Sequence, residues 1–374
     1  MEIPFLNKFS LGNGLALFKK ESGVLGIDFG SANLKIVQLK KGKTRPILET
    51  YGEIATGPYA QMPVGKSVRL VDTKAVEMIS DLLGEARAKS REASVSIPLR
   101  SSFVKIITLP LISEKEITEA IPYEVRKHIP VPLDEVIINW WILPQGEFSK
   151  NQGEEGFIKE HKSQEVLLAA IHRDLVQKYQ NIFKGAEIGV KSFEIEIFGN
   201  ARSALNPSLH PSLIIDLGAQ TSRYTVIDYG LVRLAHTLDS GSADLTDSIS
   251  KSLGVDFVRA ERLKQDIGFS QRPENKEIRS VIEPVLEYIL SEGVRVSSEY
   301  GERSGRKINK VCLIGGGALL GGVVEFAINK FGLEVERALP FNKVEHPAFL
   351  EDNLKQIGPV FATALGAAMR ALEE

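Results

Sequence analysis

One short pattern occurs twice in this chain of 374 residues. Gly-Ile-Asp-Phe-Gly-Ser-Ala stands at 26–32, and Ile-Ile-Asp-Leu-Gly-Ala-Gln stands at 214–220. In each copy an apolar strand ends in aspartate, a glycine-containing turn follows, and an alternating apolar stretch predicts a returning strand. Such turns are common, so one copy alone could be a coincidence. Two copies in register favour a duplicated phosphate-binding fold, and therefore an α/β protein with two similar halves.

A third glycine cluster follows a short apolar strand at 311–314. Gly315, Gly316 and Gly317 are followed by an apolar pattern that predicts a helix over 318–330. Glycine allows a ligand to approach the backbone closely, and a helix start offers unpaired amides. The cluster does not match G-x-x-x-x-G-K-[ST], and for this segment alone a plain structural turn is an equally good interpretation.

A different kind of segment, residues 102–188, lies between the two copies of the pattern. Ser113 and Glu116 form a capping box, which predicts that a helix begins there, and Pro122 should kink that helix. The other expected elements are strands over 136–143 and 165–171, a solvated loop over 144–163, and a helix over 174–183. The segment is therefore predicted to be a small inserted α/β subdomain.

Composition excludes several classes of protein. Forty-six basic and forty-eight acidic residues give a net charge of −2, which argues against a nucleic-acid partner. The single cysteine, Cys312, fits a reducing compartment and a buried structural thiol. No apolar run is long enough to span a bilayer, so we expect a cytoplasmic protein. Residues 1–23 are expected to be a loosely ordered extension, with an interfacial or partner-binding helix as the alternative.

With these motifs in view, the chain resembles the PilM family of type IV pilus assembly proteins over roughly 24–372. This family lies in the superfamily of actin, sugar kinases and heat-shock chaperones, and is related to the division protein FtsA. The resemblance rests on Gly26-Ile-Asp-Phe-Gly-Ser-Ala-Asn-Leu-Lys35, Ile215-Asp-Leu-Gly-Ala219, Gly315-Gly-Gly-Ala-Leu-Leu-Gly-Gly322, Ala260-Glu-Arg-Leu-Lys264, and the family-specific segment 120–135.

The resemblance implies an actin-like, ribonuclease H-like fold, with two domains around a nucleotide cleft and an FtsA-type inserted subdomain. The implied boundaries are 24–101, 189–211 and 346–374 for the first domain, 102–188 for the insert, and 212–345 for the second domain.

The resemblance also implies ATP and Mg²⁺ as cofactors and assigns roles to residues. Asp28 and Asp216 would hold the metal ion, largely through its waters. The nucleotide would be bound by Gly30, Ser31, Ala32, Asn33, Lys35, Gly218, Ala219, Gln220, Thr221, Glu261, Lys264, Gly315, Gly316, Gly317 and Leu320. Without the resemblance, Glu261 and Lys264 would be an ordinary ion pair on a helix face, and either aspartate could cap a turn.

Glu196 is the candidate for orienting a hydrolytic water. It stands where relatives carry a glutamate followed by proline, but Ile197 replaces that proline here. An acid at a helix start with no role in hydrolysis is an equally good interpretation. A weak ATPase is the most activity that we expect.

The implied function is an ATP-binding cytoplasmic scaffold of the pilus inner-membrane complex. It would bind the short cytoplasmic tail of a PilN-like protein in a groove between the insert and the first domain, lined by strand 103–109 and the helix around Tyr123. It would also contact other pilus or motor components and reach the membrane only through partners. A small-molecule kinase and an FtsA-like division protein are the alternatives, and self-association into filaments stays open.

Overall fold

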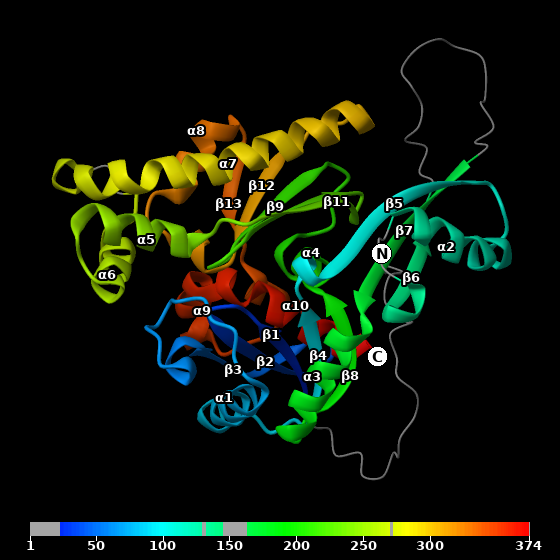
Figure 1. The fold of residues 1–374 in the computed structure, drawn as a ribbon, viewed down its shortest axis with the longest axis horizontal. Coiled ribbons are helices and arrows are strands. Elements are labelled where there is room, and N and C mark those ends of the chain that lie inside the picture. Colours follow the sequence, from blue (N-terminus) through cyan, green and yellow to red (C-terminus); the bar gives the residue numbers. More distant parts are fainter. Residues whose placement is uncertain (1–22, 129–131, 145–162, 270–271, 374) are drawn as a thin grey trace.

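The computed structural model describes residues 23–128, 132–144, 163–269 and 272–373. Two five-stranded sheets form the centres of a first unit and a second unit (Figure 1). Their strand orders are β3-β2-β1-β4-β8 and β11-β10-β9-β12-β13. In each sheet the first strand in sequence pairs antiparallel with the second and parallel with the fourth. This shared topology confirms the predicted duplicated α/β fold.

The central strands of the two sheets are mostly buried. Four of the six residues of β1 and all six of β9 are buried, as strands covered on both faces require. The first sheet contains β1 (Val24–Phe29), β2 (Asn33–Lys40), β3 (Ile47–Ala55), β4 (Glu92–Ile97) and β8 (Gly189–Ile195). The second contains β9 (Ser212–Leu217), β10 (Ser222–Asp228), β11 (Leu231–Leu238), β12 (Lys310–Ile314) and β13 (Glu334–Arg337).

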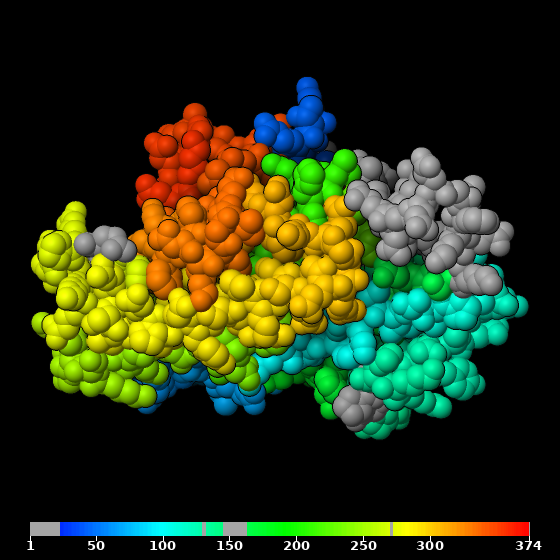
Figure 2. All heavy atoms as spheres, turned by 90° about the horizontal axis from the view of Figure 1, so that it is seen from above, coloured from blue at the N-terminus to red at the C-terminus, as the bar shows by residue number. Residues whose placement is uncertain are grey.

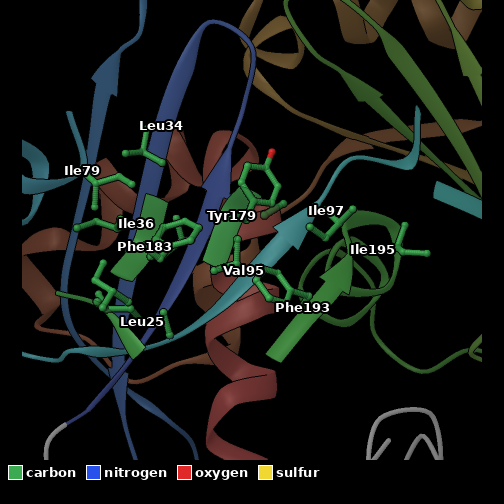
Figure 3. Close-up of a cluster of buried hydrophobic side chains, with 14 of the residues drawn as sticks. Leu25, Leu34, Ile36, Ile79, Val95, Ile97, Tyr179, Phe183, Phe193 and Ile195 are labelled. Carbon is green, nitrogen blue, oxygen red and sulfur yellow. The ribbon is translucent and has the colours of Figure 1, made fainter. Parts of the chain in front are cut away.

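Helices cover both faces of the first sheet. Leu25 and Ile27 of β1 share a core with buried residues of α1 (Asp72–Glu85) and α3 (Arg173–Gly185) (Figure 3). Between them, Gly26 faces α10 (Ala362–Glu373), where a Cβ would lie 1.9 Å from the Ala364 carbonyl oxygen. Successive side chains of a strand point to opposite faces, so α10 packs on the other side of the sheet and needs glycine there.

The second unit carries four longer helices. They are α5 (Ser242–Leu253), α6 (Phe257–Ile267), α7 (Lys276–Ser304) and α8 (Val323–Phe331). α7 contributes Ile282, Leu286 and Ile289 to the core above the second sheet. Figure 2 shows α7, yellow to orange, running along one face of the molecule, with the cyan inserted segment beside it.

The helix predicted over 318–330 begins later than the pattern indicated. A 3-10 turn, η6 (Gly316–Leu319), begins within the glycine cluster, and α8 starts only at Val323. Gly322, just before α8, has φ +79°, and a Cβ there would lie 2.4 Å from the Phe269 carbonyl oxygen. The prediction of one continuous helix was therefore wrong, because the chain changes direction at Gly322 to fit against Phe269.

The inserted segment forms a separate three-stranded sheet. Its order is β5-β7-β6, from β5 (Ser102–Pro110), β6 (Val136–Ile142) and β7 (Ser163–His172), and α2 (Glu114–His128) packs on it. The capping box is confirmed, because the Ser113 amide donates to Glu116 at 2.8 Å and the Glu116 amide donates to Ser113 Oγ at 3.3 Å. α3, which follows β7, packs against α1 and β8 of the first unit.

Two predictions fall largely outside the described residues. The amino-terminal extension is described only from Gly23 onwards, and the loop expected over 144–163 is described only at its two ends.

Candidate functional site

The two repeated turns have matching local geometry. Asp28 lies directly across the first hairpin from Lys35, and Asp216 lies directly across the second hairpin from Arg223. A Cβ on Gly30 would lie 2.8 Å from the Asn33 carbonyl oxygen, and a Cβ on Gly218 would lie 2.8 Å from the Thr221 carbonyl oxygen. Both turns therefore require glycine for the same reason, a close approach within the turn.

Neighbouring backbone fixes the carbonyl groups of both turns. In the first turn, the Ala32 oxygen accepts from the Thr56 amide at 2.8 Å, and the Ser31 oxygen accepts from the Val68 amide at 3.0 Å. In the second turn, the oxygens of Gly218 and Ala219 accept from the first two amides of α5, at 2.8 and 2.9 Å. Each turn is thus connected to a second segment of its own unit, which restricts its conformations.

A lysine and two carboxylates lie at the first turn. Lys35 Nζ is 3.6 Å from Asp28 and 4.0 Å from Glu53 of β3. Asp28 also accepts from Ser96 Oγ of β4 at 3.2 Å, and Asn33 donates to Glu53. Glu53 was not predicted as a site residue, because it lies in a strand without a recognisable motif.

Arg223 is a second site residue that the sequence did not predict. Its Nη2 lies 2.8 Å from Asp216, and its Nη1 lies 3.3 Å from Glu196 of α4 (Glu196–Ala204). Asn200, one turn further along α4, donates to Asp216 at 3.3 Å. The repeat itself contained the signal, since Arg223 stands at the position in the second copy that Lys35 occupies in the first.

Glu196 is buried where the two units meet. Its Oε1 accepts from the Leu99 amide at 2.8 Å, and its side chain is 6% exposed. Burial raises the pKa of Glu196 to about 7, although Arg223 acts in the opposite direction. The negative charges of Asp216 and Asp28 add to the rise.

Arg223 experiences the same three carboxylates. Burial alone would lower the pKa of the Arg223 guanidinium, but Asp216, Glu196 and Asp28 together raise it. Asp28 of the first unit and Asp216 of the second unit therefore both act electrostatically on Arg223, which stays positively charged.

Glu261 and Lys264, two of the residues expected near the nucleoside, contact each other. Lys264 of α6 is 2.8 Å from Glu261, and it donates to Thr246 Oγ1 at 2.9 Å and to the Ser242 carbonyl oxygen at 3.1 Å. Burial opposes the effect, but Lys264 holds the pKa of Glu261 below its usual value. α5 and α6 are therefore joined by a buried polar network close to the second turn.

The glycine cluster lies against the end of β9. Gly315 has φ +82°, and a Cβ there would lie 2.4 Å from Asp216 Oδ1. A Cβ on Gly317 would lie 2.8 Å from the Leu217 Cβ. Gly316 is exposed, whereas Leu320 is buried and its carbonyl oxygen accepts from Arg337 at 3.2 Å. The glycine cluster therefore lies next to the second turn.

Two further features bear on earlier expectations. Cys312 is fully buried in β12, and burial raises the pKa of its thiol to about 12, as expected for a structural cysteine. Within the described ranges, no helix is long and apolar enough to cross a membrane.

Comparison with known proteins adds the family to this geometry. A family profile described as type IV pilus assembly protein PilM matches residues 26–372. A chain of a solved PilM-PilN type IV pilus biogenesis complex is 25% identical, with a TM-score of 0.77, and the match covers 95% of this chain and all (100%) of that chain.

More distant structures share the fold alone. Ethanolamine utilization protein EutJ from Carboxydothermus hydrogenoformans is 16% identical, with a TM-score of 0.54 and coverage of 92% of this chain and 88% of EutJ. MreB5 of Spiroplasma citri bound to AMPPNP is 13% identical, with a TM-score of 0.52 and coverage of 94% and 96%. The duplicated sheets and these neighbours identify a two-domain actin-like fold. The profile match over nearly the whole chain shows that the protein belongs to the PilM family of type IV pilus assembly proteins.

Proposed function

We propose that the chain is an ATP-binding scaffold of the type IV pilus assembly complex. The single observation that supports this most directly is the pair of matching glycine turns, each preceded by an aspartate whose charge acts on Arg223. The triphosphate would lie between Gly30–Asn33 and Gly218–Thr221, with Lys35 beside it. The nucleoside would lie against Glu261, Lys264, the glycines at 315–317 and Leu320. Backbone amides in such turns bind phosphate oxygens without large side chains.

Mg²⁺ would accompany the nucleotide near Asp28 and Asp216. Among the described residues, no three acidic, histidine or cysteine side chains form a group that could hold a metal ion. This fits Mg²⁺, which binds through few carboxylates together with phosphate oxygens and waters. When bound, the ion would neutralise charge on the phosphates.

Glu196 would orient water for hydrolysis, but its surroundings favour slow turnover. One carboxylate oxygen accepts from the Leu99 amide, and the other lies beside Arg223. An acid whose oxygens both have protein partners is poorly free to orient a water molecule. We therefore propose weak hydrolysis, with binding of ATP as the functional event.

The proposed partner is the cytoplasmic N-terminal peptide of a PilN-like membrane protein. The similarity over the full length of a PilM chain from a solved complex with PilN supports this choice. In the inserted subdomain, β5 is an edge strand of its sheet, and the exposed Leu111 and Tyr123 lie nearby in the chain. An edge strand beside apolar side chains suits binding of an extended peptide. The groove would involve residues 103–109 and the helix around Tyr123.

Through this peptide the protein would lie at the cytoplasmic side of the inner membrane without entering it. The protein would also contact other pilus or motor components and could self-associate, in each case through surfaces outside the nucleotide site.

A capture experiment tests the proposal. Immobilised PilN tail peptide should retain the protein more strongly with Mg-ATP than without it. Asp28→Asn should abolish this difference, because it removes a carboxylate proposed to hold Mg²⁺, whereas Asp81→Asn on the exposed surface of α1 should not. Tyr123→Ala should weaken capture in both conditions, and Tyr288→Ala should leave it unchanged. The two tyrosines are matched, since both lie on helices and are 66% and 57% exposed. Equal capture by all variants, or none by the wild type, would refute the proposed scaffold.

A further inference from the structure

The two copies of the hairpin each place a cation behind their turn. The Lys35 ammonium lies 3.8 Å from the position of a Cβ on Gly30, and Arg223 Nη2 lies 2.9 Å from the position of a Cβ on Gly218. Both cations also lie across the hairpin from the aspartate that is the next-to-last residue of the preceding strand. The second turn therefore has its own cation, in the place equivalent to Lys35.

Arg223 is bound by carboxylates on both sides. Its Nε and Nη2 contact Asp216 at 3.1 and 2.8 Å, and its Nη1 contacts Glu196 at 3.3 Å. The side chain is largely buried, with 17% of its surface exposed. A guanidinium carries five donors in a planar fork, which allows it to contact a carboxylate and a phosphate oxygen at once.

A triphosphate that enters this site meets three carboxylates. Asp28, Asp216 and Glu196 all act on Arg223, and their charge would repel the phosphates unless cations compensate. Lys35 is shared between Asp28 and Glu53. The second turn has Arg223 as its compensating group.

We propose that Arg223 is a phosphate-binding residue that makes nucleotide binding by this protein only weakly dependent on Mg²⁺. Its positive charge lies between Asp216 and Glu196. Without it, a divalent ion would be needed to neutralise the negative charge of these two carboxylates. This inference rests on the proposed nucleotide site and deepens it, because it names the counter-charge on the side of the second unit.

Calorimetric titration of the full-length protein with AMPPNP, in Mg²⁺ or in EDTA, tests the inference. Arg223→Gln alone leaves two buried acids uncompensated and could unfold the protein. The double variant Arg223→Gln with Glu196→Gln removes one charge of each sign, and Glu196→Gln alone is its matched control. Circular dichroism establishes that each variant is folded before titration.

In the wild type, EDTA should weaken binding by less than roughly tenfold. Loss of a charge-assisted bond should cost the double variant roughly ten- to a hundredfold in affinity in EDTA, relative to Glu196→Gln, and less in Mg²⁺. In the Glu196→Gln background, Arg223→Lys should bind the nucleotide in EDTA more tightly than Arg223→Gln does. A purely structural role for the guanidinium group would not predict this recovery by a lysine.

Two results would overturn the inference while leaving the nucleotide site intact. One is wild-type binding that requires Mg²⁺ outright, and the other is equal affinity of the double variant and Glu196→Gln in EDTA. Absence of wild-type binding even in Mg²⁺ would overturn the proposed function as well.

Discussion

The Glu196 carboxylate lies 3.3 Å from the Arg223 guanidinium. Glu196 begins α4 in the first unit, and Arg223 lies on β10 of the second, so this ion pair connects the two units at the candidate site. Both side chains are largely buried, which makes the pair sensitive to the loss of either partner. The acid proposed to orient water is therefore also part of the contact between the units.

The raised pKa of Glu196 predicts a pH-dependent contribution to stability. The pKa of the folded protein, about 7, lies above the ordinary value of 4.5, so the native state binds this proton more tightly than the unfolded chain. The corresponding stability is fully present below pH 4.5 and is lost as the pH rises through about 7, with a total of about 3 kcal/mol. Glu196→Gln does not titrate, so its melting temperature should rise relative to the wild type between pH 5 and pH 8. A constant difference would contradict the buried, protonatable acid.

Alanine at two glycines should have opposite effects. Gly30→Ala should destabilise the first turn and weaken Mg-ATP binding at least tenfold, because the new Cβ would lie 2.8 Å from the Asn33 carbonyl oxygen. Gly84→Ala is the matched control, since nothing lies within 4 Å of a Cβ on this residue of α1. It should raise the stability by about 0.5–1 kcal/mol through helix propensity and leave ATP affinity unchanged. Thermal melting and calorimetric titration check both, and normal affinity of Gly30→Ala would argue against the turn as a phosphate site.

The repeated pattern was sufficient to predict the duplicated fold. The alternation of apolar and polar residues and the position of each aspartate are local properties of the sequence. Both hairpins form as expected, because one register buries the apolar face of each strand. The capping box at Ser113 was predictable because its two residues are only three positions apart in the sequence. The start of α8 was not predictable, because Gly322 adopts its positive φ to fit Phe269, which lies far away in the sequence.

The charged cluster required the tertiary structure. Glu196, Leu99 and Arg223 come from three separate segments, and no spacing in the sequence relates them. The part that could have been read from the sequence is the equivalence of Lys35 and Arg223, which follows from aligning the two hairpins. The aspartates and glycines were identified instead because those residues recur unchanged in both copies.

A buried ion cluster behind the site predicts strong destabilisation by a conservative change. Glu194 of β8 contacts Arg202 at 2.7 and 2.9 Å and Arg370 at 3.3 Å, and all three are buried. Glu194→Gln would remove the buried negative charge that both arginines contact and should cost about 3–5 kcal/mol.

A surface pair in the same sheet is the control for this change. Glu92 of β4 lies 2.6 Å from Lys191, and their side chains are 52% and 36% exposed. Glu92→Gln should change the stability by less than about 0.5–1 kcal/mol. Melting curves of the two variants at one pH make the comparison, and similar melting temperatures would show that the buried cluster does not stabilise the fold in this way.

A last contact between the units predicts an effect on nucleotide release. Lys66 of the first unit lies 3.2 Å from Asp247 of α5 and 4.5 Å from the centre of the Phe257 ring of α6. The same segment donates from the Val68 amide to the Ser31 carbonyl oxygen of the first turn. It therefore connects a proposed phosphate-binding turn to the helices proposed to contact the nucleoside.

Lys66→Ala should speed the release of a bound nucleotide by removing this contact. A partly exposed ion pair with a cation–π contact contributes about 1 kcal/mol, so we expect dissociation to accelerate roughly fivefold, with little change in association. Lys74→Ala is the control, because Lys74 pairs with Glu77 on the exposed surface of α1 and contacts neither turn. Stopped-flow chase of mant-ATP measures both rates. An unchanged rate of nucleotide dissociation in Lys66→Ala would mean that release does not require this contact to break. A slower rate of association would indicate instead that Lys66 contacts the nucleotide as it enters the site.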